Sequence, residues 1–99
     1  MSTCTELTIY KVSKENIRRV TELSLSIISE INKNEQVIIF HEILQRTDND
    51  EELCWYLTWI NEAAVQLHTE TWADLPSANE LMSLVKSKVY VGHFVSVIS

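Results

Sequence analysis

Apolar and polar residues alternate near the start of the chain. Between residues 5 and 12, Leu7 and Ile9 fall on one side and Tyr10 and Val12 on the other. This period of two is the pattern of a β-strand, whose successive side chains point to opposite faces of a sheet. We therefore expect the chain to open with a strand that carries apolar residues on both sides.

The period then changes to that of a helix. Ser13 is a favourable N-cap residue, and from about Lys14 to Asn32 apolar residues recur at spacings of three and four. The stripe that they form includes one small polar residue and consists of Ile17, Val20, Leu23, Ser24, Ile27, Ile28 and Ile31. The sequence therefore predicts one long amphipathic helix, capped by Ser13.

Two apolar strands separated by a polar turn follow. Residues 36–46 and 53–59 are rich in β-branched and aromatic residues, and the acidic tract 48–51 between them has the composition of a turn. Both sides of the first of these strands are largely apolar, and Trp55 and Trp59 share one side of the second. The pattern predicts a β-hairpin.

A second helix and a last strand complete the pattern. Asn61 can cap a helix that Pro76 ends. Its inward stripe would consist of Ala64, Leu67, His68, Thr71 and Leu75. A capping box from Ser77 to Glu80 restarts the helix, which we expect to end near residues 86–88. Residues 89–98 alternate again and predict a strand.

This order of elements predicts one α+β domain over residues 1–99, with a ferredoxin-like βαββαβ antiparallel sheet and helices on one face. The helices leave the other face bare, although the second and fourth strands are apolar on both sides. Soluble monomers rarely expose so large an apolar patch. We therefore expect a homodimer that buries the bare faces. A monomer with a smaller patch is the alternative.

Charge and hydropathy narrow the partners. The chain has 14 acidic and 8 basic residues, for a net charge of −6, so a nucleic acid is disfavoured as a partner. No apolar run approaches the roughly 20 residues that span a membrane, and residues 1–9 lack the pattern of a secretion signal. We expect a cytoplasmic protein without a membrane partner.

Cysteine and histidine positions bear on disulfides and metals. Cys4 and Cys54 would begin two adjacent antiparallel strands at opposite ends, too far apart for a disulfide, so we expect both to be reduced. His41 and His93 lack the spacing of metal ligands and have no neighbouring cysteine pair. The sequence therefore predicts no metal site.

The junction between the third strand and the second helix carries a local motif. The run Trp59-Ile-Asn-Glu-Ala-Ala-Val-Gln-Leu-His68 places a Trp at the strand end, an acidic helix start with small residues, and a His nine positions after the Trp. With the order of elements across nearly the whole chain, it resembles the dimeric α+β barrel superfamily and, within it, the antibiotic-biosynthesis-monooxygenase type. The resemblance implies that fold, a homodimer and oxygenation of a small aromatic or quinol-like substrate without a cofactor. It does not imply haem degradation, because Ala78 and Asn79 stand near the later His of the haem-degrading members.

His68 is the candidate catalytic residue, since an imidazole on the inward side of a helix can orient or deprotonate a phenolic substrate. The candidate substrate-binding residues are Trp59, Trp72, Ser24 and Tyr10. The structural alternatives stay open: His68 bonded within the core, the tryptophans as core residues, and Ser24 as a small residue that lets the helix approach the sheet. A non-catalytic dimer that binds a small ligand, or a purely structural one, is the alternative function.

Overall fold

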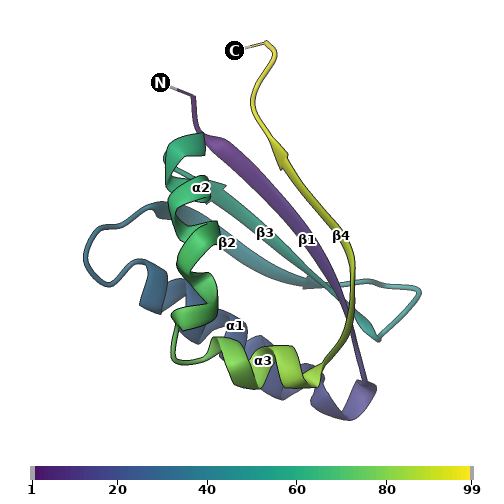
Figure 1. Cartoon of the computed structure of the whole chain (residues 1–99). Coiled ribbons are helices and arrows are strands. Elements are labelled where there is room, and N and C mark those ends of the chain that lie inside the picture. The colour runs from purple at the N-terminus through teal and green to yellow at the C-terminus, as the bar shows by residue number, and fades with distance from the viewer. Residues whose placement is uncertain (1, 99) are drawn as a thin grey trace.

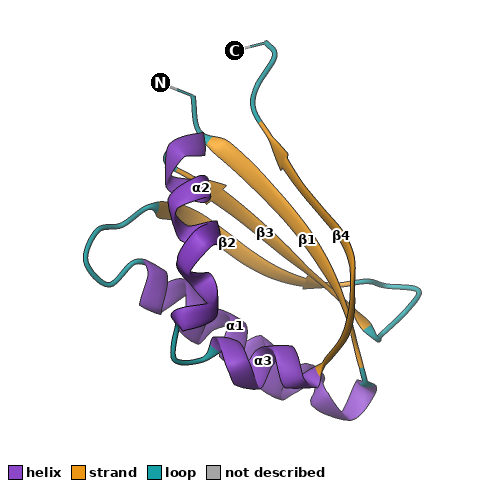
Figure 2. Cartoon of the chain, in the orientation of Figure 1, coloured by secondary structure: helices purple, strands orange, loops and turns teal. Residues whose placement is uncertain are grey.

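A four-stranded antiparallel sheet forms one layer of the molecule and the helices form the other (Figure 1). The computed structural model describes residues 2–98, so Met1 and Ser99 of the predicted domain lie outside the described residues. The strands lie in the order β2-β3-β1-β4 and are β1 (Cys4–Val12), β2 (Ile38–Gln45), β3 (Glu52–Trp59) and β4 (Val85–Phe94). The helices cover one face of the sheet (Figure 2) and are α1 (Ile17–Ile31), α2 (Glu62–Thr71) and α3 (Ala78–Leu84). The predicted ferredoxin-like fold is confirmed.

The core lies between α1 and the covered face of the sheet. Alternate residues of β1 are buried there, namely Cys4, Glu6, Thr8, Tyr10 and Val12. The predicted stripe of α1 is confirmed, because six of its seven members are buried and Ile17 is half-buried. Each fully buried aliphatic side chain contributes about 1.5–3 kcal/mol relative to an exposed one, so this layer supplies much of the stability.

Three predicted helix caps have different outcomes. Asn61 is confirmed, since its side chain accepts a hydrogen bond from the backbone N–H of Ala64 at 2.8 Å. Ser13 makes no side-chain cap, because the chain first forms a 3₁₀ turn (Lys14–Asn16) held by backbone bonds. The capping box at Ser77 is also wrong, because the Ser77 hydroxyl donates instead to Glu30 at 2.6 Å.

The last predicted boundary is also wrong. The helix ends at Leu84 and the strand runs over Val85–Phe94, not over residues 89–98. Val85 is opposite Val12 in the β1–β4 ladder, so pairing with the sheet draws residues 85–88 out of the helix. On α2, Leu67 and Thr71 are exposed although the predicted stripe placed them inward. The buried positions of α2 are Ala64 and Val65.

The face of the sheet that points away from the helices is apolar and uncovered. The ladder places a set of large side chains there that are 37–49% exposed, namely Phe40, Leu44, Tyr56, Tyr90 and Phe94. We call this set the open face. The Phe40 and Tyr56 rings meet edge to face, with centroids 5.9 Å apart. The bare apolar face expected from the sequence is therefore present.

Cys4 and Cys54 are both free thiols, as expected. Cys4 is opposite Trp59 in the β1–β3 ladder, whereas Cys54 is opposite Ile9, so the two lie near opposite ends of it. Among residues 2–98, no helix combines the length and the apolar character needed to cross a bilayer.

Candidate functional site

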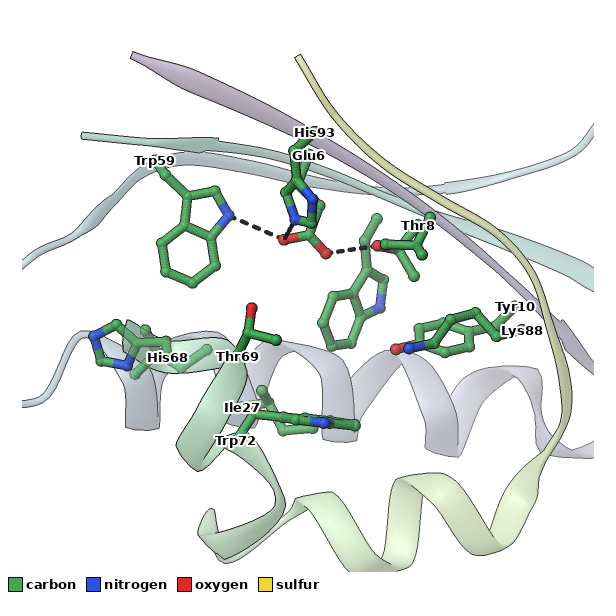
Figure 3. A pocket seen from close by; sticks show the side chains of 13 residues that line it. Glu6, Thr8, Tyr10, Ile27, Trp59, His68, Thr69, Trp72, Lys88 and His93 are labelled. Atoms are coloured by element: carbon green, nitrogen blue, oxygen red, sulfur yellow. Dashed lines mark hydrogen bonds and ion pairs between the residues drawn. The ribbon is translucent and has the colours of Figure 1, made fainter. Parts of the chain in front are cut away.

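A cavity of about 210 Å³ lies between the covered face of the sheet and α2 (Figure 3). Aromatic side chains form much of its wall, namely Tyr10, Trp55, Trp59 and Trp72. The aliphatic part comes from Ile27 and Ile31 of α1 and Val91 of β4. An apolar cavity of about 150 Å³ is large enough to hold benzene, so this one can hold a substituted single ring.

Glu6 brings a buried carboxylate to this cavity. Its side chain comes from the covered face of β1, and the residue is only 9% exposed. The indole N–H of Trp59 donates to one carboxylate oxygen at 3.0 Å, and the hydroxyl of Thr8 donates to the other at 2.5 Å. Burying a charge costs several kcal/mol unless it is paired or hydrogen-bonded, and these two donors offset part of that cost.

His93 stands beside the same carboxylate. The β1–β4 ladder sets His93 directly opposite Glu6, and its Nε2 lies 3.5 Å from the Glu6 oxygen that Trp59 also contacts. Its side chain is 35% exposed, so the imidazole meets both the cavity and the surface. A carboxylate beside an imidazole fixes the orientation of the ring.

Tyr10 and Lys88 also line the cavity. Burial, and next the charge of Glu6, raise the pKa of the Tyr10 phenol well above its usual value, so the hydroxyl stays protonated and can donate. Among residues 2–98 this hydroxyl has no hydrogen-bond partner. The amino group of Lys88 lies 6.0 Å from the centre of the Tyr10 ring. The polar ends of both side chains reach the cavity (Figure 3).

His68 enters from α2 and is half-buried. Its ring is tilted by 37° against that of Trp59, with the ring centres 5.8 Å apart. Trp72 follows in the 3₁₀ turn after α2 and is also half-buried. The structure thus gathers four of the predicted site residues around one cavity: His68, Trp59, Trp72 and Tyr10.

Ser24 does not line this cavity. It is fully buried, donates to the carbonyl of Val20 at 2.7 Å, and accepts from the indole N–H of Trp55 at 2.9 Å. Its hydroxyl is therefore engaged within the core and not at this cavity, unlike the substrate-binding role predicted for it. Ser24 reaches the site only through Trp55, whose orientation it fixes.

Sequence reasoning missed Glu6, Thr8, Lys88 and His93, which the structure places in the cavity wall. A signal for Glu6 existed, since it shares the alternation of Tyr10 and Val12 along the first strand. A carboxylate in a buried register is unusual unless it is paired. Among residues 2–98, no three side chains of His, Cys, Asp or Glu gather as metal ligands.

No family model matches the sequence, and no curated protein matches it either. The structure is nonetheless similar to solved structures along almost their whole length. A variant of SnoaB, a cofactor-independent oxygenase from Streptomyces nogalater, has a TM-score of 0.71 at 16% identity, covering 100% of this chain and 97% of that one. A candidate antibiotic biosynthesis monooxygenase from Caulobacter crescentus has a TM-score of 0.75 at 8% identity, covering 98% and 92%.

The chain has the fold of antibiotic biosynthesis monooxygenases. A protein of unknown function from Bacteroides thetaiotaomicron, described as a possible oxidoreductase, has the same fold, with a TM-score of 0.75 at 15% identity over 96% of this chain and 98% of that one. At such identities the likeness concerns the fold, and a fold alone does not determine the chemistry. The aromatic walls of the cavity can hold a planar ring, and its carboxylate and imidazoles can exchange a proton with a hydroxyl group on that ring.

Proposed function

We propose that this protein is a monooxygenase that uses no cofactor and acts on a small aromatic or quinol-like substrate held in the cavity. The observation that carries the proposal is the combination of an aromatic-walled cavity of about 210 Å³ with a buried carboxylate and two imidazoles on its wall. A mostly apolar pocket with a few converging polar groups is the usual form of a small-molecule site. The fold shared with a cofactor-independent oxygenase supports the same reaction class.

The proposed reaction needs no reductant besides the substrate. Loss of the phenolic proton leaves an electron-rich anion, which passes electrons to O₂. One oxygen atom then bonds to a ring carbon, and the other leaves as water with the hydroxyl proton and the hydrogen of that carbon. A phenol and O₂ thus give a quinone and water, with all electrons supplied by the ring.

His68 is proposed to orient the substrate hydroxyl while Trp59 and Trp72 hold the ring, with Tyr10 at the wall. Its tilted contact with Trp59 places the imidazole next to where a stacked ring would lie. A hydrogen bond between the imidazole and the substrate oxygen would fix the reacting oxygen, and positioning of this kind is a large part of many rate enhancements.

Oxygen uptake tests this function. Protein without added metal or flavin is mixed with a small hydroquinone, and the uncatalysed rate of a heat-inactivated sample is subtracted. We expect saturable uptake, reduced about 100-fold or more in His68→Ala if the residue acts directly on the substrate. His41→Ala is the matched control, because His41 is exposed on β2. Full activity in His68→Ala would remove this residue from the mechanism.

A non-catalytic protein that binds a small aromatic ligand is the second candidate. It is favoured by the isolation of His68, which has no carboxylate partner among residues 2–98, whereas catalytic imidazoles are often oriented by one. Saturable quenching of tryptophan fluorescence by hydroquinones, without oxygen uptake, would decide for binding alone.

We also propose that the protein is a homodimer joined through the open face. The support is the set of five large exposed side chains on a face that no helix of residues 2–98 covers. Two-fold symmetry needs only one self-complementary surface, and this face is a contiguous candidate for it. The cavity lies on the opposite face of the sheet, so such a dimer leaves it accessible.

A further inference from the structure

Glu6 and His93 have no assigned role in the proposed reaction. The carboxylate is buried, its two oxygens already accept from Trp59 and Thr8, and the imidazole is the basic group nearest to it. Among residues 2–98, no other carboxylate lines this cavity. A buried carboxylate held beside an imidazole on a cavity wall is the arrangement that activates a base in many enzymes.

We infer that the Glu6 and His93 pair is the proton acceptor of the cavity and that the cavity selects hydroxyarenes, which it binds as phenolates. The inference rests on the proposed function, whose base it identifies. The O–H bond of the ligand breaks and an N–H bond forms on the imidazole. With Nε2 facing Glu6 and carrying a hydrogen, Nδ1 is left to take the proton. The carboxylate then offsets the positive charge of the imidazolium.

The two imidazoles have different surroundings. His93 has a carboxylate oxygen 3.5 Å away, whereas His68 contacts the ring of Trp59 and has no ion-pair partner among residues 2–98. His93 therefore has a carboxylate in place as a counter-charge, and His68 has an aromatic ring. This difference assigns proton transfer to His93 and leaves positioning to His68.

Other titratable groups also face His93. Glu62 and Glu70 of α2 line a shallow hollow with it on the outer side, and their negative charges favour the imidazolium in the same direction as Glu6. His68 and Lys88 line the shared cavity, and a positive charge on Lys88 acts in the opposite direction. The contact with Glu6 at 3.5 Å is the ion pair that His93 makes among residues 2–98, so Glu6 is its partner.

The remaining polar groups suit the other end of such a ligand. The Tyr10 hydroxyl is protonated, has no partner among residues 2–98, and can donate, and Lys88 adds a positive charge near it. These groups stabilise negative charge that moves across the ring after the proton leaves. A phenol with an acceptor group opposite its hydroxyl therefore matches both ends of the cavity.

4-Nitrophenol tests this inference without any oxygen chemistry. It is a single ring with an acceptor group opposite the hydroxyl, and its phenolate absorbs visible light whereas the neutral form does not. Protein is titrated into the probe, anaerobically, at a pH well below the pKa of the free probe. We expect the phenolate band to appear with saturation. We also expect it to fall at least tenfold in Glu6→Gln and in His93→Gln.

His41→Gln is the matched control and should keep the band, because His41 lies outside the cavity. Circular dichroism checks that each variant is folded. If Glu6→Gln does not fold, His93→Gln still tests the pair, because His93 is at a partly exposed position.

Three results would overturn the inference: a band that survives in both pair variants, binding in the neutral form, or no binding by calorimetry. A band without oxygen uptake from hydroquinones would keep the inference and reject the oxygenase. Normal oxygen uptake in both Glu6→Gln and His93→Gln would keep the oxygenase and reject the inference.

Discussion

The two faces of the sheet differ in which side chains they bury and which they expose. On the covered face the buried side chains include Glu6 and Thr8, and each has a hydrogen-bond partner. On the open face, large apolar side chains such as Phe40 and Phe94 are nearly half exposed. The covered face thus buries two polar groups beside its apolar core, while the open face leaves large apolar groups bare, and a free-standing domain rarely has either feature.

This difference between the faces indicates two roles for one sheet. Buried polar groups cost free energy, so a site where they are kept and paired is a candidate for chemistry. An exposed apolar surface costs nothing once a partner covers it, so the bare face is a candidate for assembly. Both interpretations can be tested by changing one face and comparing the result with a matched change elsewhere.

The largest expected effect is on the open face. Phe40→Asp places a charge in the proposed interface, and we expect the mass measured by light scattering to fall from two subunits to one. Leu25→Asp is the control, since Leu25 is similarly exposed at 45% but lies on α1, away from the open face. A wild-type mass of one subunit at micromolar concentration would remove the dimer altogether.

The next effect separates the core from the surface of α1. Leu23 is 3% exposed, so Leu23→Ala should lower the free energy of unfolding by about 2–5 kcal/mol through lost burial and a residual cavity. Leu25→Ala, two residues away and exposed, should change it by less than about 0.5 kcal/mol. Urea denaturation at one fixed protein concentration measures both. Equal losses would show that the outer side of α1 is covered too.

A smaller effect is expected where the core supports the cavity. Ser24→Ala leaves the indole N–H of Trp55 without its acceptor, at a cost of about 1–3 kcal/mol. The exposed Ser26→Ala should be nearly neutral. Tryptophan fluorescence should also shift in Ser24→Ala, because Trp55 becomes free to reorient. An unchanged spectrum with unchanged stability would mean that this hydrogen bond does not hold the ring.

The elements could be predicted from the sequence because their signals are local. The alternation from Leu7 to Val12 has the period of a strand, and the stripe from Val20 to Ile31 has that of a helix. In each element the buried residues recur with the same period. The order of these elements then leaves few sheets that connect them. The bare apolar face was predictable for the same reason, since both sides of a strand can be read from its residues.

The site was only partly predictable because its contacts are distant in sequence. His68 could be predicted from its place on the inward side of the second helix, but Glu6 meets His93 only through the register of β1 with β4. The capping box failed for the same reason. Ser77 and Glu80 have the right spacing, but their side chains bond to residues of α1 instead. Ser77 donates to Glu30, and Glu80 accepts from Arg19.

That last contact gives the smallest predicted effect. Arg19 donates to both oxygens of Glu80 at 2.7 Å, and these hydrogen bonds lower the pKa of the Glu80 carboxyl. A carboxyl whose pKa is lowered by folding stabilises the protein above the pKa it has when unfolded. This contribution disappears as the pH falls through the folded pKa. Glu80→Gln should therefore be less stable than wild type at neutral pH, with a gap that narrows in acid.

Urea midpoints measured from neutral to acidic pH at low salt provide the measurement, and urea is preferred because guanidinium salts screen exposed charges. Both side chains are about half exposed, so the gap should be small and should shrink when salt is added. Glu35→Gln is the control, since Glu35 is exposed and makes no ion pair among residues 2–98. A gap that stays constant between neutral and acidic pH would mean that the contact between α1 and α3 acts through packing, because a neutral carboxyl would then serve as well as a charged one.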